Sequence, residues 1–302
     1  KKKTGLKRLW KDRYLYLLLV PVVTFYILFK YVPLYGLLIA FKDYKFSTGI
    51  LGSPWVGLKH FEEMFRSGIF YTVLRNTLLL NVYNVVFGFP IPIILALLLN
   101  EMNRQWYKRL VQQLIYIPHF FSWVVLGGMV VSILSPRAGA VNFILEKVIG
   151  RKIFFMASDF WWPVVFVLSD IWKEAGWGTI IYLAAISGVD AQLYEAAIID
   201  GANKFKQVLH ITIPSIKPTI IILLVLRLGY MMDVGFEQVF MLQNNAVMKV
   251  ADVISTYVYR MGIMGYQYSA TTAIGIFQSL ISVVLLVTAN KLSNKFAETG
   301  IW

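Results

Sequence analysis

Six long apolar runs constrain this chain more than any other feature of its sequence. A helix that crosses a bilayer needs about 20 apolar residues, and such runs lie at roughly 14–40, 70–99, 112–134, 162–186, 216–241 and 270–290. Only 15% of the residues are charged, whereas a soluble domain carries about 25%. The sequence therefore predicts an all-α integral membrane protein whose six spanning helices form one membrane domain, residues 14–290.

Several kinds of chemistry are excluded by what the sequence lacks. It contains no cysteine, so disulfides, thiolate metal sites and cysteine nucleophiles are excluded. His60, His119 and His210 are far apart and no HExxH motif is present, so we expect no metal site and no cofactor in this chain. No GxxxxGK[ST] phosphate loop is present, so the chain is not expected to be an enzyme that hydrolyses ATP.

The distribution of basic residues predicts how the chain is oriented. The tail at 1–13, the loop near 100–111, the loop at 187–216 and the tail at 291–302 carry more Lys and Arg than the loops at 41–69, 135–161 and 242–269. Because Lys and Arg accumulate on the cytoplasmic side, both termini and the 187–216 loop are expected to be cytoplasmic. The net charge of +13 then indicates contact with anionic lipid rather than nucleic acid.

The stretch YEAAIIDGANKFKQVLHITIP, residues 194–214, is a polar insert between two apolar runs. Asp190 is a suitable N-cap for a short helix over about 191–200, and Gly201 stands where a glycine would end it. Ala196 and Ala197 make one side of this helix thin enough to enter a groove, and Glu195 offers a charge to a partner. From these residues alone, a docking element and an ordinary connector with helix-forming alanines remain open.

The pattern EAAIIDGA followed by ITIP resembles the EAA loop of inner-membrane permeases of binding-protein-dependent ABC importers. Segments such as FKYVPLYGLLIAFKDY (29–44), YIPHFFSWVV (116–125) and IWKEAGWGTIIYLAAI (171–186) resemble the carbohydrate branch of that family, and more narrowly the LplB-type permeases for oligosaccharides from polysaccharide breakdown. The resemblance extends over almost the whole chain.

This resemblance implies the type I ABC importer permease fold in a bacterial inner or plasma membrane. It implies a heterodimer with a second permease, two ATPase subunits that bind ATP and Mg, and an extracytoplasmic sugar-binding protein. It also implies that the insert is the coupling helix that docks on an ATPase, through Glu195, Ala196, Ala197, Asp200, Gly201 and Pro214.

Polar residues within two runs are candidates for a substrate route, because ionisable residues within a membrane are costly and usually functional. Asp170, Lys173, Glu174 and Trp177 share one face of a helix by their spacing. If residues 216–241 form one helix, its polar face holds Arg227, Tyr230, Asp233 and Glu237. The predicted route residues are Trp172, Lys173, Glu174, Trp177, Arg227, Tyr230, Asp233 and Glu237, with the alternative that these charges only hold helices together.

Three further expectations complete the interpretation. Asn76, Asn81, Tyr83 and Asn84 are a second candidate set for the route, but the asparagines are rather expected to form hydrogen bonds across helices. Segments 42–55 and 261–269 are candidates to meet the binding protein, with the alternative that these loops only cap the helices. The competing function is a proton-coupled secondary sugar transporter that would use Asp233 and Glu237. An intramembrane enzyme has no nucleophile or metal constellation to support it.

Overall fold

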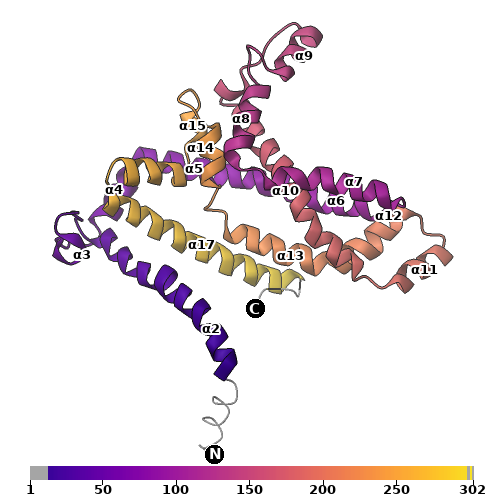
Figure 1. The fold of residues 1–302 in the computed structure, drawn as a ribbon, viewed down its shortest axis with the longest axis horizontal. Coiled ribbons are helices and arrows are strands. Elements are labelled where there is room, and N and C mark those ends of the chain that lie inside the picture. The colour runs from indigo at the N-terminus through magenta and orange to yellow at the C-terminus, as the bar shows by residue number, and fades with distance from the viewer. Residues whose placement is uncertain (1–12, 298–299, 301–302) are drawn as a thin grey trace, which may run out of the picture. The chain divides into compact units, whose positions relative to one another are not determined.

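The computed structural model describes residues 13–297 and Gly300, with the side chains of Phe296 and Ala297 excepted. The predicted basic tail before Arg13, and residues 298, 299, 301 and 302 of the predicted C-terminal tail, lie outside the described residues. Within them the regular elements are helices, accompanied by one isolated β-bridge between Lys42 and Trp55. The all-α prediction is confirmed for this part of the chain (Figure 1).

Four helices are long and apolar enough to cross a membrane, by length and composition: Arg13–Phe41, Gly68–Asn100, Lys204–Gly229 and Tyr268–Lys295. A fifth candidate is the bent pair Gln105–Phe120 and Trp123–Ile133. The helix α10, Trp161–Ser187, is long enough to cross a membrane but carries too many charged residues to be counted among these helices. The reason is that every 18-residue window in it contains Asp170, Lys173 and Glu174, which are the charges that made it a candidate for a polar route.

The helices divide into two compact units. The first contains the chain up to Arg66 together with Met261–Ile276. Its elements are α2 (Arg13–Tyr26), η1 (Ile27–Tyr31), η2 (Val32–Phe41), α3 (Gly49–Gly52), α4 (Lys59–Arg66) and the beginning of α17 (Tyr268–Ala297). The side chains of α2 are exposed, as expected of a helix whose apolar surface faces lipid or a partner.

The second unit contains Ser67–Arg260 and the chain from Phe277 onward. Its central helix α10 contacts α6 (Pro90–Asn100), α7 (Gln105–Tyr116) and α13 (Ile213–Gly229). The remaining elements are α5 (Gly68–Tyr83), η3 (Asn84–Gly88), η4 (Ile117–Phe120), α8 (Trp123–Ile133), α9 (Ala140–Ile149), η5 (Phe155–Ala157), α11 (Ala191–Ile199), α12 (Lys204–Gln207), η6 (Val208–Thr212), α14 (Phe236–Leu242), α15 (Met248–Ala251), α16 (Ile254–Val258), η7 (Tyr259–Met264), which continues past Arg260, and the rest of α17.

Two apolar cores lie along α10. Near its beginning, Trp162 and Phe166 pack with Val239 and Leu242 of α14, and the Trp162 indole donates a 2.9 Å hydrogen bond to the Leu242 carbonyl. Near its end, Tyr182 and Ile186 pack with Ala96 of α6 and Ile216 of α13. The middle of α10, where the charged residues lie, separates these two cores.

The third predicted span, 112–134, is not one straight helix. Its two halves meet at an angle of 103° after Phe120. Pro118 opens the 3-10 turn η4, and Ser122 caps α8 by accepting a hydrogen bond from the Val125 N–H. The bend follows from these local signals, because proline interrupts the α-helical hydrogen bonds and a serine cap starts a new helix.

The prediction of one helix over 216–241 is wrong. The helix runs from Lys204 to Gly229, and α14 begins only at Phe236. The backbone between them is irregular, with Gly235 at φ 70° and the Asp233 carboxylate accepting a 3.1 Å hydrogen bond from the Gly235 N–H. A left-handed residue cannot continue a right-handed helix, so the assumed polar face from Arg227 to Glu237 does not exist.

Candidate functional site

A cavity of about 460 Å³ lies beside the middle of α10 in the second unit. Its polar wall comes from Asp170, Glu174 and Trp177 of α10, Arg227 of α13 and Asn84 of η3. Apolar side chains such as Leu223 and Ile181 complete the lining. Carboxylates, a guanidinium, an amide and an indole are groups that bind the hydroxyls and the apolar ring faces of a sugar.

The spacing argument for α10 is confirmed for three of its four residues. Asp170, Glu174 and Trp177 all line this cavity, as expected for residues separated by one and two helical turns. Trp172 lies elsewhere and lines a second, apolar hollow with Trp161 and Phe155. Its place in the predicted route is therefore not supported by this cavity.

Lys173 is not among the residues that line the cavity, although its ammonium nitrogen is 3.5 Å from the Glu174 carboxylate, and it also contacts the bend after Phe120. Only 8% of the residue is exposed, and its ammonium group donates hydrogen bonds to the carbonyls of His119, at 2.7 Å, and Phe121, at 3.1 Å. These carbonyls lie at the break between η4 and α8, where no helical donor follows. The geometry therefore favours a role for Lys173 in holding the bend.

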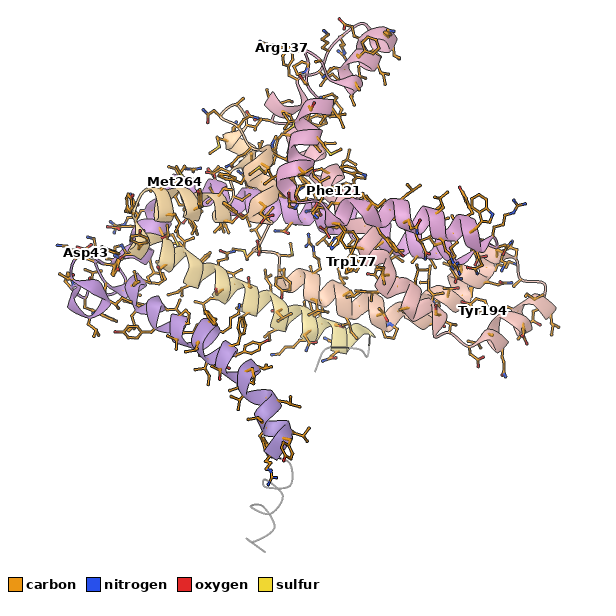
Figure 2. All side chains as sticks on the ribbon, in the orientation of Figure 1. Asp43, Phe121, Arg137, Trp177, Tyr194 and Met264 are labelled. Atoms are coloured by element: carbon orange, nitrogen blue, oxygen red, sulfur yellow. The ribbon has the colours of Figure 1, made fainter. Side chains whose placement is uncertain are left out.

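His119 is a residue of this site that the sequence analysis did not select. Its Nδ1 atom is 2.9 Å from Oε2 of Glu174, and its ring stacks on Trp177 with centroids 4.5 Å apart and planes 2° apart. Two contacts to cavity residues thus fix the orientation of the Trp177 indole and of the Glu174 carboxylate. Trp177 is labelled in Figure 2. The only signal in the sequence was its place just after Pro118, which marks a bend but not its partner.

The second predicted face divides at the break after Gly229. Arg227 reaches the cavity, but Tyr230, Asp233 and Glu237 are exposed and are not among the residues that line it. Asp233 belongs to the irregular segment and Glu237 to the first turn of α14. The two carboxylates assumed by the proton-carrier hypothesis therefore do not share a helix face.

Two of the three asparagines form the expected bonds across helices. Asn76 donates to the carbonyls of Lys249 and Asp252, at 3.0 and 2.9 Å. Asn81 donates to the carbonyls of Met231 and Asp233, at 2.8 and 3.2 Å, and so stabilises the break in the fifth span. For Asn84 the expectation is wrong, because its buried amide oxygen has no hydrogen-bond partner.

A partly buried ion pair lies beside the Asn76 contact. The Asp252 carboxylate accepts from both terminal nitrogens of Arg260, at 2.6 and 3.2 Å, and also from the Thr256 hydroxyl. Hydrogen bonding to Asp252 raises the pKa of Arg260 above its ordinary value. Because the pKa of Arg260 is higher in the folded state, its positive charge stabilises the fold at every pH below that pKa. The contribution of Arg260 to the free energy of unfolding is therefore constant near neutral pH and is lost only as the pH rises through the raised pKa.

The predicted short helix over about 191–200, ended by Gly201, is confirmed by α11, Ala191–Ile199. Asp190 caps α11 by accepting a 2.9 Å hydrogen bond from the Gln192 N–H, and Gly201 has φ 75° just after the helix. The turn is closed by a 2.8 Å bond from the Ala202 N–H to the Ala197 carbonyl. Tyr194 lies 2.9 Å from the Thr212 hydroxyl, which fixes α11 to the start of the next helix.

This turn exposes large apolar side chains that the sequence analysis had not selected. Ile199 is 86% exposed and Phe205 is 74% exposed, on either side of Gly201. Glu195 and Ala196 are exposed, Ala197 is half-buried, and Pro214 follows η6 at an exposed position. Exposed apolar side chains beside a charge are typical of a surface that another protein covers.

The two segments expected to meet a binding protein, 42–55 and 261–269, contact each other in the first unit. The Ser269 hydroxyl donates to the Lys42 carbonyl at 2.7 Å and accepts from the Tyr44 N–H at 3.0 Å. The rings of Tyr44 and Tyr268 form an edge contact. More than 200 residues of sequence separate these partners, so the sequence alone could not have predicted their contact.

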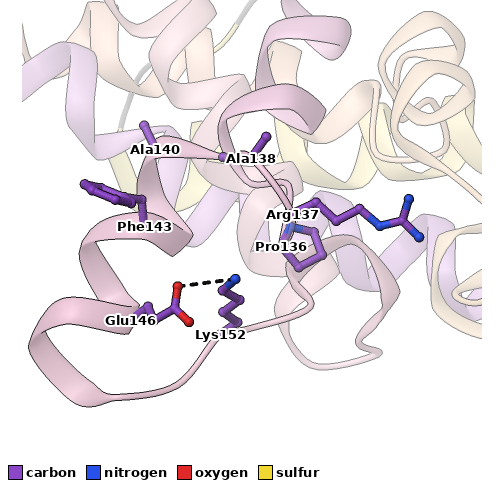
Figure 3. A pocket seen from close by; sticks show the side chains of 8 residues that line it. Pro136, Arg137, Ala138, Ala140, Phe143, Glu146 and Lys152 are labelled. Atoms are coloured by element: carbon purple, nitrogen blue, oxygen red, sulfur yellow. Dashed lines mark ion pairs between the residues drawn. The ribbon is translucent and has the colours of Figure 1, made fainter.

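A separate hollow of about 230 Å³ lies beside α9 in the second unit, closed by the 3.2 Å ion pair between Glu146 and Lys152 (Figure 3). None of the predicted route residues lines it. Within the described residues, no group of three His, Asp or Glu side chains could hold a metal ion.

Comparison with known proteins identifies the family. The family model for the binding-protein-dependent transport system inner membrane component matches residues 88–297. The chain belongs to this family. Its members are permease components of ABC transport systems, and the predicted recognition is confirmed.

Individual relatives agree with that membership. The polygalacturonan/rhamnogalacturonan transport system permease protein YteP of Bacillus subtilis is 46% identical over 302 residues, which are 100% of this chain and 94% of YteP. The protein LplB of Bacillus subtilis is 44% identical, over 97% of this chain and 92% of LplB.

A solved bacterial ABC transporter involved in the import of the acidic polysaccharide alginate has a chain that is 40% identical, with a TM-score of 0.90 over 96% of this chain and 98% of that one. A second structure of an alginate ABC transporter, in complex with an alginate pentasaccharide-bound periplasmic protein, gives a TM-score of 0.91 at 40% identity over 98% of this chain and 99% of that one.

Proposed function

We propose that this chain is a permease subunit of an ATP-driven importer of oligosaccharides in a bacterial inner or plasma membrane. In this proposal the chain crosses the membrane six times, and both of its termini are in the cytoplasm. The observation that carries it is the cavity beside α10, where Asp170, Glu174, Arg227 and Trp177 offer sugar-binding chemistry inside a transport permease. The names of YteP and of the alginate importer support saccharides from acidic polysaccharides as substrates.

The α11–α12 turn is proposed to couple this permease to ATPase subunits that carry ATP and Mg. Glu195, Ala196, Ala197, Asp200, Gly201 and Pro214 form the docking element, and we add Ile199 and Phe205 because their apolar side chains are largely exposed. The turn is joined to α10 and to α13, which both contribute to the cavity wall. Movement of the turn would therefore reach the substrate route directly.

The remaining partners of the proposal are a second permease, with which this chain forms a heterodimer, membrane lipid and an extracytoplasmic sugar-binding protein. Segments 42–55 and 261–269 are proposed to receive the binding protein. They expose several large side chains, among them Phe46 and Leu51 in the first segment and Tyr266 in the second. The periplasmic protein present in the alginate transporter complex supports this assignment.

The substitution Glu195→Lys tests the coupling. Glu195 is exposed and forms no ion pair with another residue that the structure describes, so the variant should insert and fold normally. Reversal of its charge should weaken docking, and we expect import into proteoliposomes to fall at least tenfold while the ATPase subunits become easier to separate from the complex. Glu62→Lys, an exposed charge reversal on α4, is the control and should retain import. Full import by Glu195→Lys would contradict the coupling role.

A further inference from the structure

Asn84 differs from the two other asparagines on the same span. All three are buried, with exposed fractions of 2%, 1% and 5% for Asn76, Asn81 and Asn84. The first two donate to backbone carbonyls of other segments. The Asn84 amide oxygen has no hydrogen-bond partner in the described part of the chain.

A buried amide without a hydrogen bond requires an explanation, because nearly all buried polar groups in folded proteins are paired. Three other buried polar atoms in the described residues lack a hydrogen-bond partner, in His60, Gln243 and Ser255, but none of these residues lines the α10 cavity. Asn84 does line it, opposite Asp170 and Glu174 of α10. Among these four residues, Asn84 is the one that lines this cavity, where a ligand could approach its amide.

The backbone around Asn84 explains how an amide can be held there. Asn84 is the first residue of the π-turn η3, in which the Phe89 N–H bonds to the Asn84 carbonyl at 3.0 Å. Single π-turns within helices are frequent at functional sites. The turn places the residue at the junction of α5 and α6, next to Gly88, Phe89 and Pro92, which also line the cavity.

We propose that Asn84 is a specificity-determining residue that binds a hydroxyl group of the transported saccharide in this cavity. An amide both donates and accepts, and so it matches a sugar hydroxyl, which does the same. The neighbouring carboxylates only accept when ionised, and Arg227 only donates. Asn84 therefore adds to the cavity a neutral group that can bind a hydroxyl in either direction. This inference rests on the proposed function of the cavity.

The test uses the complete importer in proteoliposomes, with the partner permease, the ATPase subunits and saturating amounts of loaded binding protein. The probes are a galacturonate or alginate trisaccharide, whichever the wild-type importer takes up, and its set of monodeoxy analogues. A site that pairs with a hydroxyl discriminates strongly against the analogue that lacks it. The measured quantity is the ratio of the import rate of the parent sugar to that of each analogue.

For wild-type importer we expect at least one analogue to be imported at least tenfold more slowly than the parent sugar. In Asn84→Leu this ratio should fall to about one, because the hydroxyl no longer has its partner. Asn84→Ser, which is smaller and polar, should restore part of the ratio. Asn76→Leu should lower assembly and both rates together, leaving the ratio unchanged, because Asn76 holds backbone carbonyls.

The outcomes separate the two levels of the proposal. If Asn84→Leu and Asn84→Ser both give the same import-rate ratios as the wild type for every analogue, the role of Asn84 is overturned. The proposed importer function would be unaffected by that result. If the wild-type complex imports neither trisaccharide, the proposed substrate class of acidic saccharides fails, and the inference for these sugars fails with it. If Asn84→Leu does not assemble, Asn84→Asp has nearly the same size and is measured in its place. The ionised carboxylate of Asn84→Asp can only accept hydrogen bonds. Import-rate ratios that are the same as in the wild type for both Asn84→Asp and Asn84→Ser would therefore also overturn the role of Asn84 in binding a hydroxyl.

Discussion

At the scale of the residue, Gly176 permits the closest approach between α10 and the end of α7. A Cβ atom at this position would collide with the backbone carbonyl of Ile115. Backbone cannot move aside as a flexible side chain can, so we expect Gly176→Ala to destabilise the purified protein by about 1–3 kcal/mol. Thermal unfolding in detergent, followed by tryptophan fluorescence, measures the change.

Gly128→Ala in α8 is the matched control. A Cβ atom there meets nothing within 4 Å, and alanine is about 1 kcal/mol more favourable than glycine in a helix. This variant should be as stable as the wild type or slightly more stable. Equal unfolding temperatures for the two variants would mean that α10 does not approach Ile115 this closely.

The same scale shows what the sequence could predict about the site. The spacing of Asp170, Glu174 and Trp177 places them on one helix face without further information, and all three line the cavity. Lys173 has the same spacing but a longer side chain, which reaches two free carbonyls in another helix. His119 was missed for a related reason, since its importance comes from Trp177 and Glu174, more than 50 residues away.

At the scale of the element, three prolines within long helices each follow a π-turn. The π-turns Ile27–Tyr31, Asn84–Gly88 and Val208–Thr212 end two residues before Pro33, Pro90 and Pro214. In each, the residue just before the proline donates its N–H to the first carbonyl of the turn. A proline lacks an N–H donor and its ring is bulky, and both disrupt a regular α-helix. The wider π-turn leaves room for the ring and shifts the hydrogen bonds so that the helix continues past the proline.

The substitution Pro90→Ala tests this reading. Alanine brings back an N–H donor, and the π-turn leaves a carbonyl for it to use, so the stability should remain within about 1 kcal/mol of the wild type. Leu95→Pro, in the regular part of α6, has no π-turn before it and should cost about 3 kcal/mol or more. Denaturation in detergent compares the two variants, and an equal loss of stability in both would contradict the compensation by the π-turn.

Element boundaries could be predicted where a long apolar run has no internal breaker. The predicted 162–186 span agrees with α10, Trp161–Ser187, within one residue at each end. The predicted 216–241 span was wrong because hydrophobicity continues through a region where the backbone does not remain helical. The irregular segment survives there because Asn81 and Gln278 donate to the carbonyls of residues 231–233, which no sequence pattern indicates.

At the scale of the whole molecule, the chain forms two compact units, and the first brings together segments from near its beginning and near its end. That unit joins segments 42–55 and 261–269, whose candidate role is to receive a binding protein. Tyr266 there has φ 56°, the one left-handed residue other than glycine in the described part of the chain. A strained residue held on an exposed surface favours a functional role for that surface.

The absence of cysteine allows a direct test of this arrangement. We expect Tyr44→Cys combined with Tyr268→Cys to be joined efficiently by a short bifunctional thiol reagent, because the two rings lie with centroids 5.8 Å apart. Each single variant is the control and should give no intramolecular link. Loaded binding protein should slow the modification of Tyr266→Cys, whose native side chain is 76% exposed. If the double variant is linked but binding protein does not slow the modification of Tyr266→Cys, the fold of this unit stands and segment 261–269 is not a docking surface. If the double variant is not linked, the fold of this unit is contradicted.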